Sequence, residues 1–225
     1  RDMGPDRLVK SCPSGIVSGV GFLEKCNGFD VFALEQGGTG SFFRLSEENR
    51  KDLEMETTTV DQYPDCVQLT SGAFRIAVTT TVGPRVLAGH IGDSPNIFRI
   101  MPDQPVPQAQ TDFRLRGGHR LWHSPEAAPR TYAADNDPVD VTETEDGVCF
   151  SRGLEPLTGL EKSITIQPLG EEKLRVTHRL INRGQWPVEL APWALYVMSR
   201  GGTAVIPQHR NLEGDMFTPD RSLVL

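Results

Sequence analysis

The stretch CVQLTSGAFRIAVTTTVGPRVLAGHIG, residues 66–92, decides the fold class. Three apolar residues in it alternate with small or polar ones: Phe74, Ile76 and Val78. This period of two is typical of a strand that buries one face. Gly83-Pro84 interrupts the pattern, and RVLAGHI (85–91) then predicts a second strand. Two strands joined by so short a break indicate antiparallel β structure.

The chain beyond residue 92 shows the same texture. VDVTETEDGVCFSR (139–152) predicts a hairpin that turns at Asp146-Gly147, since such a pair tolerates positive φ. Residues 162–198 predict three further strands, with turns at Leu169-Gly170 and at 182–184. No long helical period occurs after residue 66. These features together predict an all-β fold, a sandwich or a barrel of antiparallel strands.

Residues 1–60 have a different texture, with glycine and serine recurring without a steady apolar period. Their glycine clusters match neither a dinucleotide fingerprint nor a phosphate-binding loop. TTTVDQYPD (57–65) predicts a linker. We therefore expect a flexible or small N-terminal segment of unknown role at 1–60 and one β domain at 61–225. The apolar ending DRSLVL (220–225) suggests that this domain is incomplete, or that its last strand pairs elsewhere.

The composition of the chain argues against some classes of binding partner. The 225 residues carry a net charge of -7 and have a pI of about 5.3, without the basic clusters that nucleic-acid binding needs. No apolar run approaches the roughly 20 residues of a membrane-spanning helix. None of the four cysteines has CxxC spacing, and no signal peptide is visible, which favours the cytoplasm over secretion. We expect no nucleic acid, membrane or cofactor; the oligomeric state stays open.

The stretch LRGGHRLWHSPEAAPRTY (115–132) holds the densest chemistry in the chain. His119 and His123 are four residues apart, so on a helical turn they could ligate a metal together with Glu126. The flanking glycines and Ser124-Pro125 argue against such a helix. Either histidine could instead transfer protons near neutral pH, or hydrogen-bond the loop backbone.

Arginine and aromatic residues near these histidines fit sugar recognition. Arg120 and Arg130 offer planar donor forks for hydroxyl pairs or a carboxylate, or they could form ion pairs with Glu126 or Asp135. Three aromatic residues could each present a flat face to a pyranose ring or fill the core: Trp122, Tyr132 and Trp193.

Three further residues could have either a functional or a structural role. Glu189 lies in the apolar stretch PVELAPW (187–193), so we expect it to be buried, either as a base or paired with an arginine. His178 has the strand parity of Val176 and Leu180, which predicts a core histidine. Arg85 follows the Gly-Pro corner and could bind substrate or be structural.

Four blocks resemble one known group. They are GGHRLWHSPE (117–126), RTYAADNDPV (130–139), GLEKSITI (159–166) and LRVTHRLINRGQWPVELAPWALYVMSRGG (174–202). Together they resemble an uncharacterised bacterial family with the galactose-mutarotase-like fold, related to aldose 1-epimerases, over roughly residues 65–225. The resemblance implies an antiparallel β-supersandwich that binds a carbohydrate in a cleft across one sheet.

The resemblance also implies a chemistry. Mutarotation needs a base at the anomeric hydroxyl and an acid at the ring oxygen. A family histidine corresponds to His119, the second falls at Trp193, whose indole cannot act as an acid, and the family glutamate would lie past Leu225. The predicted catalytic residues are therefore His119, His123 and Glu189, with Glu126 as another candidate base. The predicted sugar-binding residues are Arg85, Arg120, Trp122, Glu126, Arg130, Tyr132 and Trp193.

Three hypotheses follow. The first is an isomerase of the aldose 1-epimerase kind, and the second is a sugar-binding domain without chemistry. The third is a metal-dependent carbohydrate enzyme that uses His119 and His123.

Overall fold

The computed structural model describes residues 16–26, 29–35, 53–145, 147–169 and 173–201, which consist of strands and connecting loops. Within these ranges the helical segments are two single 3-10 turns, η1 (Pro107–Ala109) and η2 (Arg130–Tyr132). The predicted all-β, antiparallel class is confirmed. No helix among the described residues is both long enough and apolar enough to cross a membrane.

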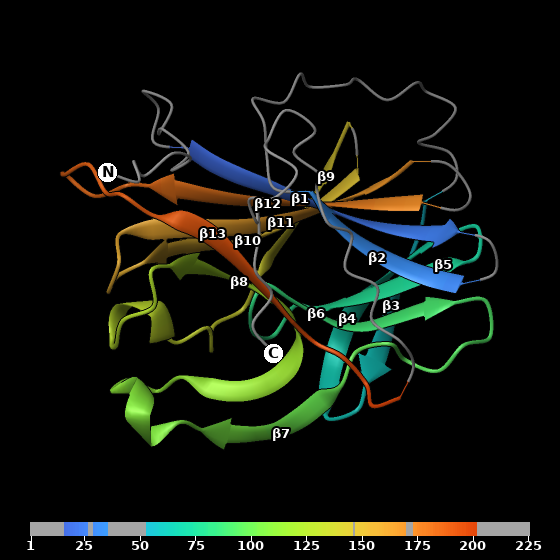
Figure 1. The fold of residues 1–225 in the computed structure, drawn as a ribbon, viewed down its shortest axis with the longest axis horizontal. Coiled ribbons are helices and arrows are strands. Elements are labelled where there is room, and N and C mark those ends of the chain that lie inside the picture. Colours follow the sequence, from blue (N-terminus) through green and yellow to red (C-terminus); the bar gives the residue numbers. More distant parts are fainter. Residues whose placement is uncertain (1–15, 27–28, 36–52, 146, 170–172, 202–225) are drawn as a thin grey trace, which may run out of the picture.

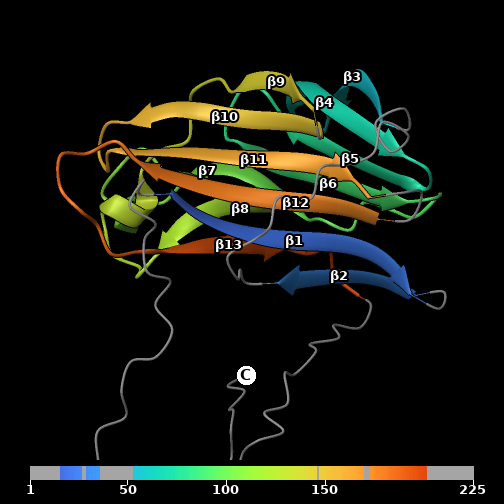
Figure 2. The same cartoon turned by 90° about the horizontal axis from the view of Figure 1, so that it is seen from above.

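One sheet has six strands, which Figure 2 shows side by side. In order across the sheet they are β2 (Phe29–Glu35), β1 (Ile16–Cys26), β12 (Lys173–Asn182), β11 (Leu160–Pro168), β10 (Gly147–Glu155) and β9 (Asp140–Thr144). All neighbours are antiparallel. The β9–β10 pair confirms the hairpin that the sequence predicts, and β11 and β12 are two of the three later strands.

The other sheet has seven strands. Across it run β13 (Ala191–Val197), β8 (Arg114–Ser124), β6 (Arg85–Ile91), β5 (Phe74–Thr79), β4 (Tyr63–Ser71) and β3 (Glu54–Val60), and β7 (Ile100–Pro105) adds to β8. All of these pairs are antiparallel too. The two strands predicted on either side of Gly83-Pro84 are β5 and β6.

The two sheets stack as layers with an apolar core between them (Figure 1). Both sheets supply this core because alternate residues of each strand point inward. Ile76 and Val86 come from the seven-stranded sheet, and Phe150, Ile164 and Val176 come from the six-stranded one; all are buried. Strand β13 lies near β1 and β12, so the two sheets approach each other at this edge.

The N-terminal part of the chain differs from the sequence prediction. The predicted linker at 57–65 is a hairpin instead: β3 turns through Asp61, which has φ 52°, into β4. Threonine and valine side chains stabilise strands, and this preference outweighs the turn residues around them. Strand β1 pairs with β12, with Gly19 opposite His178, and β2 pairs with β1, so residues 16–26 and 29–35 belong to the six-stranded sheet. The apolar ending at 220–225 lies outside the described residues.

Candidate functional site

Strand β8 carries four of the predicted site residues, His119, Arg120, Trp122 and His123, and it presents different residues on its two faces. His119 lies opposite Val86 and Tyr196 on neighbouring strands, facing the core between the sheets. Arg120 lies opposite Arg85, on the other face. We call the face of the seven-stranded sheet that points away from the six-stranded sheet the outer face. The histidines of the GGHRLWH block thus face inward, while its arginine, Arg120, and its tryptophan, Trp122, face outward.

Two glycines give β8 its path. Gly117 and Gly118 have φ values of +76° and +67°, a region that side chains rarely adopt. A Cβ on Gly117 would lie 2.1 Å from the Arg99 carbonyl oxygen, and one on Gly118 would lie 2.2 Å from that of Val86. Only glycine therefore allows β7 and β6 to approach β8 this closely. This close approach positions the residues of β8 that follow Gly118.

On the outer face, Arg120 is the centre of an aromatic cluster. Its guanidinium carbon lies 4.3 Å from the centre of the Phe113 ring and 3.9 Å from that of Trp122, a cation–π arrangement with each of two adjacent rings. Trp122 in turn meets Trp193 edge to face at 5.3 Å and Tyr132 at 5.1 Å. We call these five residues the aromatic cluster. Trp193 and Tyr132 are only half-buried, so parts of their rings face solvent.

Arg120 is deeply buried and poorly satisfied. The residue is 7% exposed, and neither its Nε nor its Nη1 has a hydrogen-bond partner among the described residues. Burial lowers the pKa of the guanidinium, whereas the nearby Asp135 carboxylate raises it. A guanidinium nonetheless keeps its proton in proteins, so Arg120 is a buried cation.

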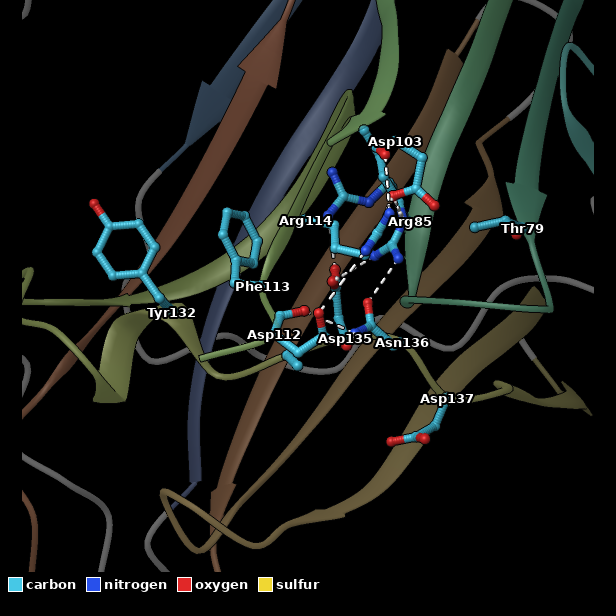
Figure 3. Close-up of polar contacts among 12 residues, drawn as sticks. Thr79, Arg85, Asp103, Asp112, Phe113, Arg114, Tyr132, Asp135, Asn136 and Asp137 are labelled. Carbon is cyan, nitrogen blue, oxygen red and sulfur yellow. Dashed lines mark hydrogen bonds and ion pairs between the residues drawn. The ribbon is translucent and has the colours of Figure 1, made fainter. Parts of the chain in front are cut away.

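An arginine network lies beside the aromatic cluster, and Figure 3 shows its side chains converging. Asp135 accepts from Arg85 Nη2 at 2.7 Å on one oxygen and from Arg116 Nη1 at 2.9 Å on the other. Arg85 Nη1 also donates to the Gly117 carbonyl at 2.7 Å. Burial raises the pKa of Asp135, but the arginines, Arg85 foremost, lower it further, so the net shift is well below its usual range. Asp135 is therefore a permanent carboxylate with both oxygens engaged.

On the inner face, His119 pairs with a histidine of the opposite sheet. Its Nε2 lies 2.6 Å from His178 Nε2, and its Nδ1 lies 3.1 Å from the Leu195 carbonyl. The ring also stacks on Tyr196, with 4.0 Å between centres. Burial, followed by the neighbouring His178, holds the pKa of His119 well below its usual 6.5. A neutral ring that donates from Nδ1 must accept at Nε2, so His178 is the donor of this pair.

His123 also faces inward, near a buried ion pair. Lys162 Nζ lies 2.7 Å from Glu155 Oε2, and Thr158 Oγ1 donates to the other Glu155 oxygen at 2.6 Å. Burial, then the charge of Lys162, lowers the pKa of His123 from its usual 6.5 to about 4. Its Nδ1 has no partner among the residues that the structure describes. His123 is therefore neutral at physiological pH.

The other predicted residues lie apart from these groups or at their rim. Glu189 is exposed, in the irregular segment before β13, so the expectation that it is buried is wrong. Pro187 explains part of the error, because a proline opposes strand pairing, and β13 begins only at Ala191. Glu126 is exposed and accepts a hydrogen bond from the Tyr132 hydroxyl. Arg130 donates to the Pro125 carbonyl at 2.6 Å rather than to a carboxylate.

A metal site at His119 and His123 is not supported by this geometry. The two lie on an extended strand, where four residues span about 13 Å, too far to share one ion. Over the described ranges no three residues of the ligating types His, Cys, Asp and Glu cluster to hold a metal.

One pocket of the described structure lies elsewhere, where the free edges β3 and β9 of the two sheets meet. It is lined by Leu53, Met55, Glu143, Thr144, Gly147, Val148 and Pro168. None of the predicted site residues lines it. Its lining offers a single carboxylate and no aromatic ring, so the outer face of β8 is chemically the richer site.

Comparison with known proteins adds no relative: no family model, no curated protein and no solved structure matches this chain. The likeness to the galactose-mutarotase group therefore stays a prediction.

Sequence reasoning missed several residues of these groups. The sequence contained a signal for Lys162, because its parity in LEKSITIQP matches that of Leu160, Ile164 and Ile166, all buried. His178 is buried on the apolar face of β12, as its parity predicts, but its bond to His119 joins residues 59 positions apart. Arg116 and Phe113 had no such signal, because their partners come from distant loops.

Proposed function

We propose that this protein binds a carbohydrate on the outer face of the seven-stranded sheet, at the aromatic cluster. The observation that carries the proposal is Arg120, held against Phe113 and Trp122 with nitrogen donors unused, beside the half-buried rings of Trp193 and Tyr132. Apolar ring faces suit the CH face of a pyranose, and a fixed guanidinium suits its oxygen atoms.

The architecture is compatible with this proposal. Two stacked antiparallel sheets, one of them with a polar and aromatic outer face, agree with the galactose-mutarotase type of supersandwich that the resemblance implies. We include that fold type in the proposal. The site would then lie across one sheet, where the resemblance places the carbohydrate cleft.

Binding is better supported than isomerisation. Ring opening requires an acid and a base on the side of the sheet that holds the sugar. His119 and His123 face the interior, and both nitrogens of His119 are engaged there. Asp135 is saturated by two arginines, and Glu189 lies in an exposed segment. Polarimetry on fresh α-D-glucose and α-D-galactose should accordingly show the spontaneous rate of mutarotation.

The test of the proposal is sugar binding by the wild type and by Trp193→Ala, screened on a glycan array and measured by calorimetry. Removal of the Trp193 ring should weaken binding by about two- to tenfold, since a stacked aromatic ring contributes about 0.5–1.5 kcal/mol. Trp186→Ala is the matched control, because Trp186 is 77% exposed and outside the aromatic cluster. Sugars that fail to bind, or that bind equally to Trp193→Ala, would contradict the proposal.

A further inference from the structure

Arg120 is a buried positive charge that the described residues do not neutralise. It forms no ion pair and no hydrogen bond within the described ranges, and its Nε and Nη1 are buried without partners. Other buried cations of this protein differ: Arg85 and Arg116 pair with Asp135, and Lys162 pairs with Glu155. A desolvated charge without a partner is unfavourable, so its persistence calls for an anion.

The nearest carboxylate does not serve this purpose. Both oxygens of Asp135 already accept from other arginines, at 2.7 and 2.9 Å. Glu155, the other carboxylate whose charge acts on Arg120, pairs with Lys162 at 2.7 Å and accepts from Thr158 on its second oxygen. Asp135 therefore acts on Arg120 only through space.

The position of the guanidinium is fixed. Phe113 and Trp122 each contact it, at 4.3 and 3.9 Å. Such preorganisation lowers the entropic cost of binding. The same rings belong to the cluster in which Trp193 and Tyr132 are half-buried. One charged group and several aromatic rings thus lie side by side.

We infer that the carbohydrate bound at the aromatic cluster carries an anionic group, a carboxylate or a phosphate, and that Arg120 is its counter-ion. The inference rests on the proposed function and specifies its ligand class: a uronic acid or a sugar phosphate. Trp193 and Tyr132 contact the sugar ring, and Arg120 binds the anion.

The experiment compares matched sugars by calorimetry on the wild-type protein: glucose against glucuronate and glucose 6-phosphate, and galactose against galacturonate. We expect at least one acidic sugar to bind about tenfold or more tightly than its neutral counterpart, because hydrogen bonds to charged groups are the stronger ones. The uronate and phosphate arms identify which anion is preferred. Inorganic phosphate and acetate alone should bind more weakly, because they lack the ring.

Two variants test whether Arg120 is responsible. Arg120→Met should remove the preference for the acidic sugar and leave weak binding of the neutral one. Arg120→Lys keeps the charge but loses the planar fork, so it should retain part of the preference. A further measurement uses the wild-type protein alone. Its affinity for the acidic sugar should fall with added salt, and its affinity for the neutral sugar should not.

The outcomes separate the two claims. Equal binding of acidic and neutral sugars, or an acidic preference that survives in Arg120→Met, overturns the inference and leaves sugar binding in place. An acidic preference without salt dependence also overturns it. Failure of every sugar to bind overturns the proposed function and the inference with it.

Discussion

Replacement of His123 by leucine should make the protein more resistant to acid. In the folded state the ring is 2% exposed and its pKa is lowered to about 4 by burial and by Lys162. In the unfolded chain the same ring is protonated near its usual 6.5. A lowered histidine pKa means that the unfolded state binds more protons between these values. Stability is therefore fully present above about pH 6.5 and is lost as the pH falls toward 4.

The size of this effect follows from the two pKa values. The difference between 6.5 and about 4, at about 1.36 kcal/mol for each pH unit, gives about 3 kcal/mol in total. At about pH 4.5 roughly 2 kcal/mol of this is already lost. Leucine has a similar volume and leaves no unpaired Nδ1, so at about pH 7 we expect His123→Leu to lie within about 1 kcal/mol of the wild type.

The assay is urea unfolding at several pH values between about 7 and 4.5. The wild type should lose about 2 kcal/mol more than His123→Leu over this range. His90→Leu is the matched control, since His90 is only half-buried and hydrogen-bonds the Ser94 carbonyl at a loop. His119 and His178 are present in both the wild type and His123→Leu. The difference between the pH dependences of these two proteins therefore reports on His123 alone. Parallel curves would refute the assignment of His123 as a buried neutral base.

Two further substitutions test the structure that supports the site, at Gly118 on β8 and at the buried ion pair of Lys162 and Glu155. Gly118→Ala should reduce the free energy of unfolding by more than about 2 kcal/mol, because its φ is +67° and the new Cβ would meet the Val86 carbonyl. Gly153→Ala meets no atom within 4 Å and should change stability by less than about 1 kcal/mol in the same urea assay. Lys162→Met should cost about 3–5 kcal/mol by leaving the Glu155 carboxylate buried and unpaired, and combination with Glu155→Leu should recover most of that loss. A double-mutant cycle without coupling would contradict the buried ion pair.

The sequence predicts the fold class well because strand alternation is a local signal. Phe74, Ile76 and Val78 lie on β5 as expected, and β9 pairs with β10 as the predicted hairpin requires. The linker prediction at 57–65 failed because turn residues also occur inside hairpins. The same turn residues occur in linkers and in the short turns that join two paired strands. Local composition therefore does not distinguish a linker from a β-hairpin.

The candidate site was only partly predictable. Arg120, Trp122 and Trp193 come together on the outer face, and the sequence proposed all three. The separation of His119 from Arg120 was missed, because the choice between helix and strand decides whether neighbours in the sequence share a face. The partners of Arg85 were also missed, because Asp135 is 50 residues away and reaches it from a loop.

The hydrogen bond between His119 and His178 is a directional contact that ties the two sheets together. Apolar packing is non-directional, so an apolar layer alone would tolerate several alignments of β8 over β12. A slip of two residues, about 7 Å, would preserve the faces of β8 but place Gly117 or Leu121 over His178. Neither residue has a side chain that can accept the His178 proton, so that alignment loses the hydrogen bond between the two rings. The hydrogen bond between the two histidines thus favours one alignment of β8 over β12. By fixing β8, it also fixes the position of Arg120 on the outer face of the seven-stranded sheet.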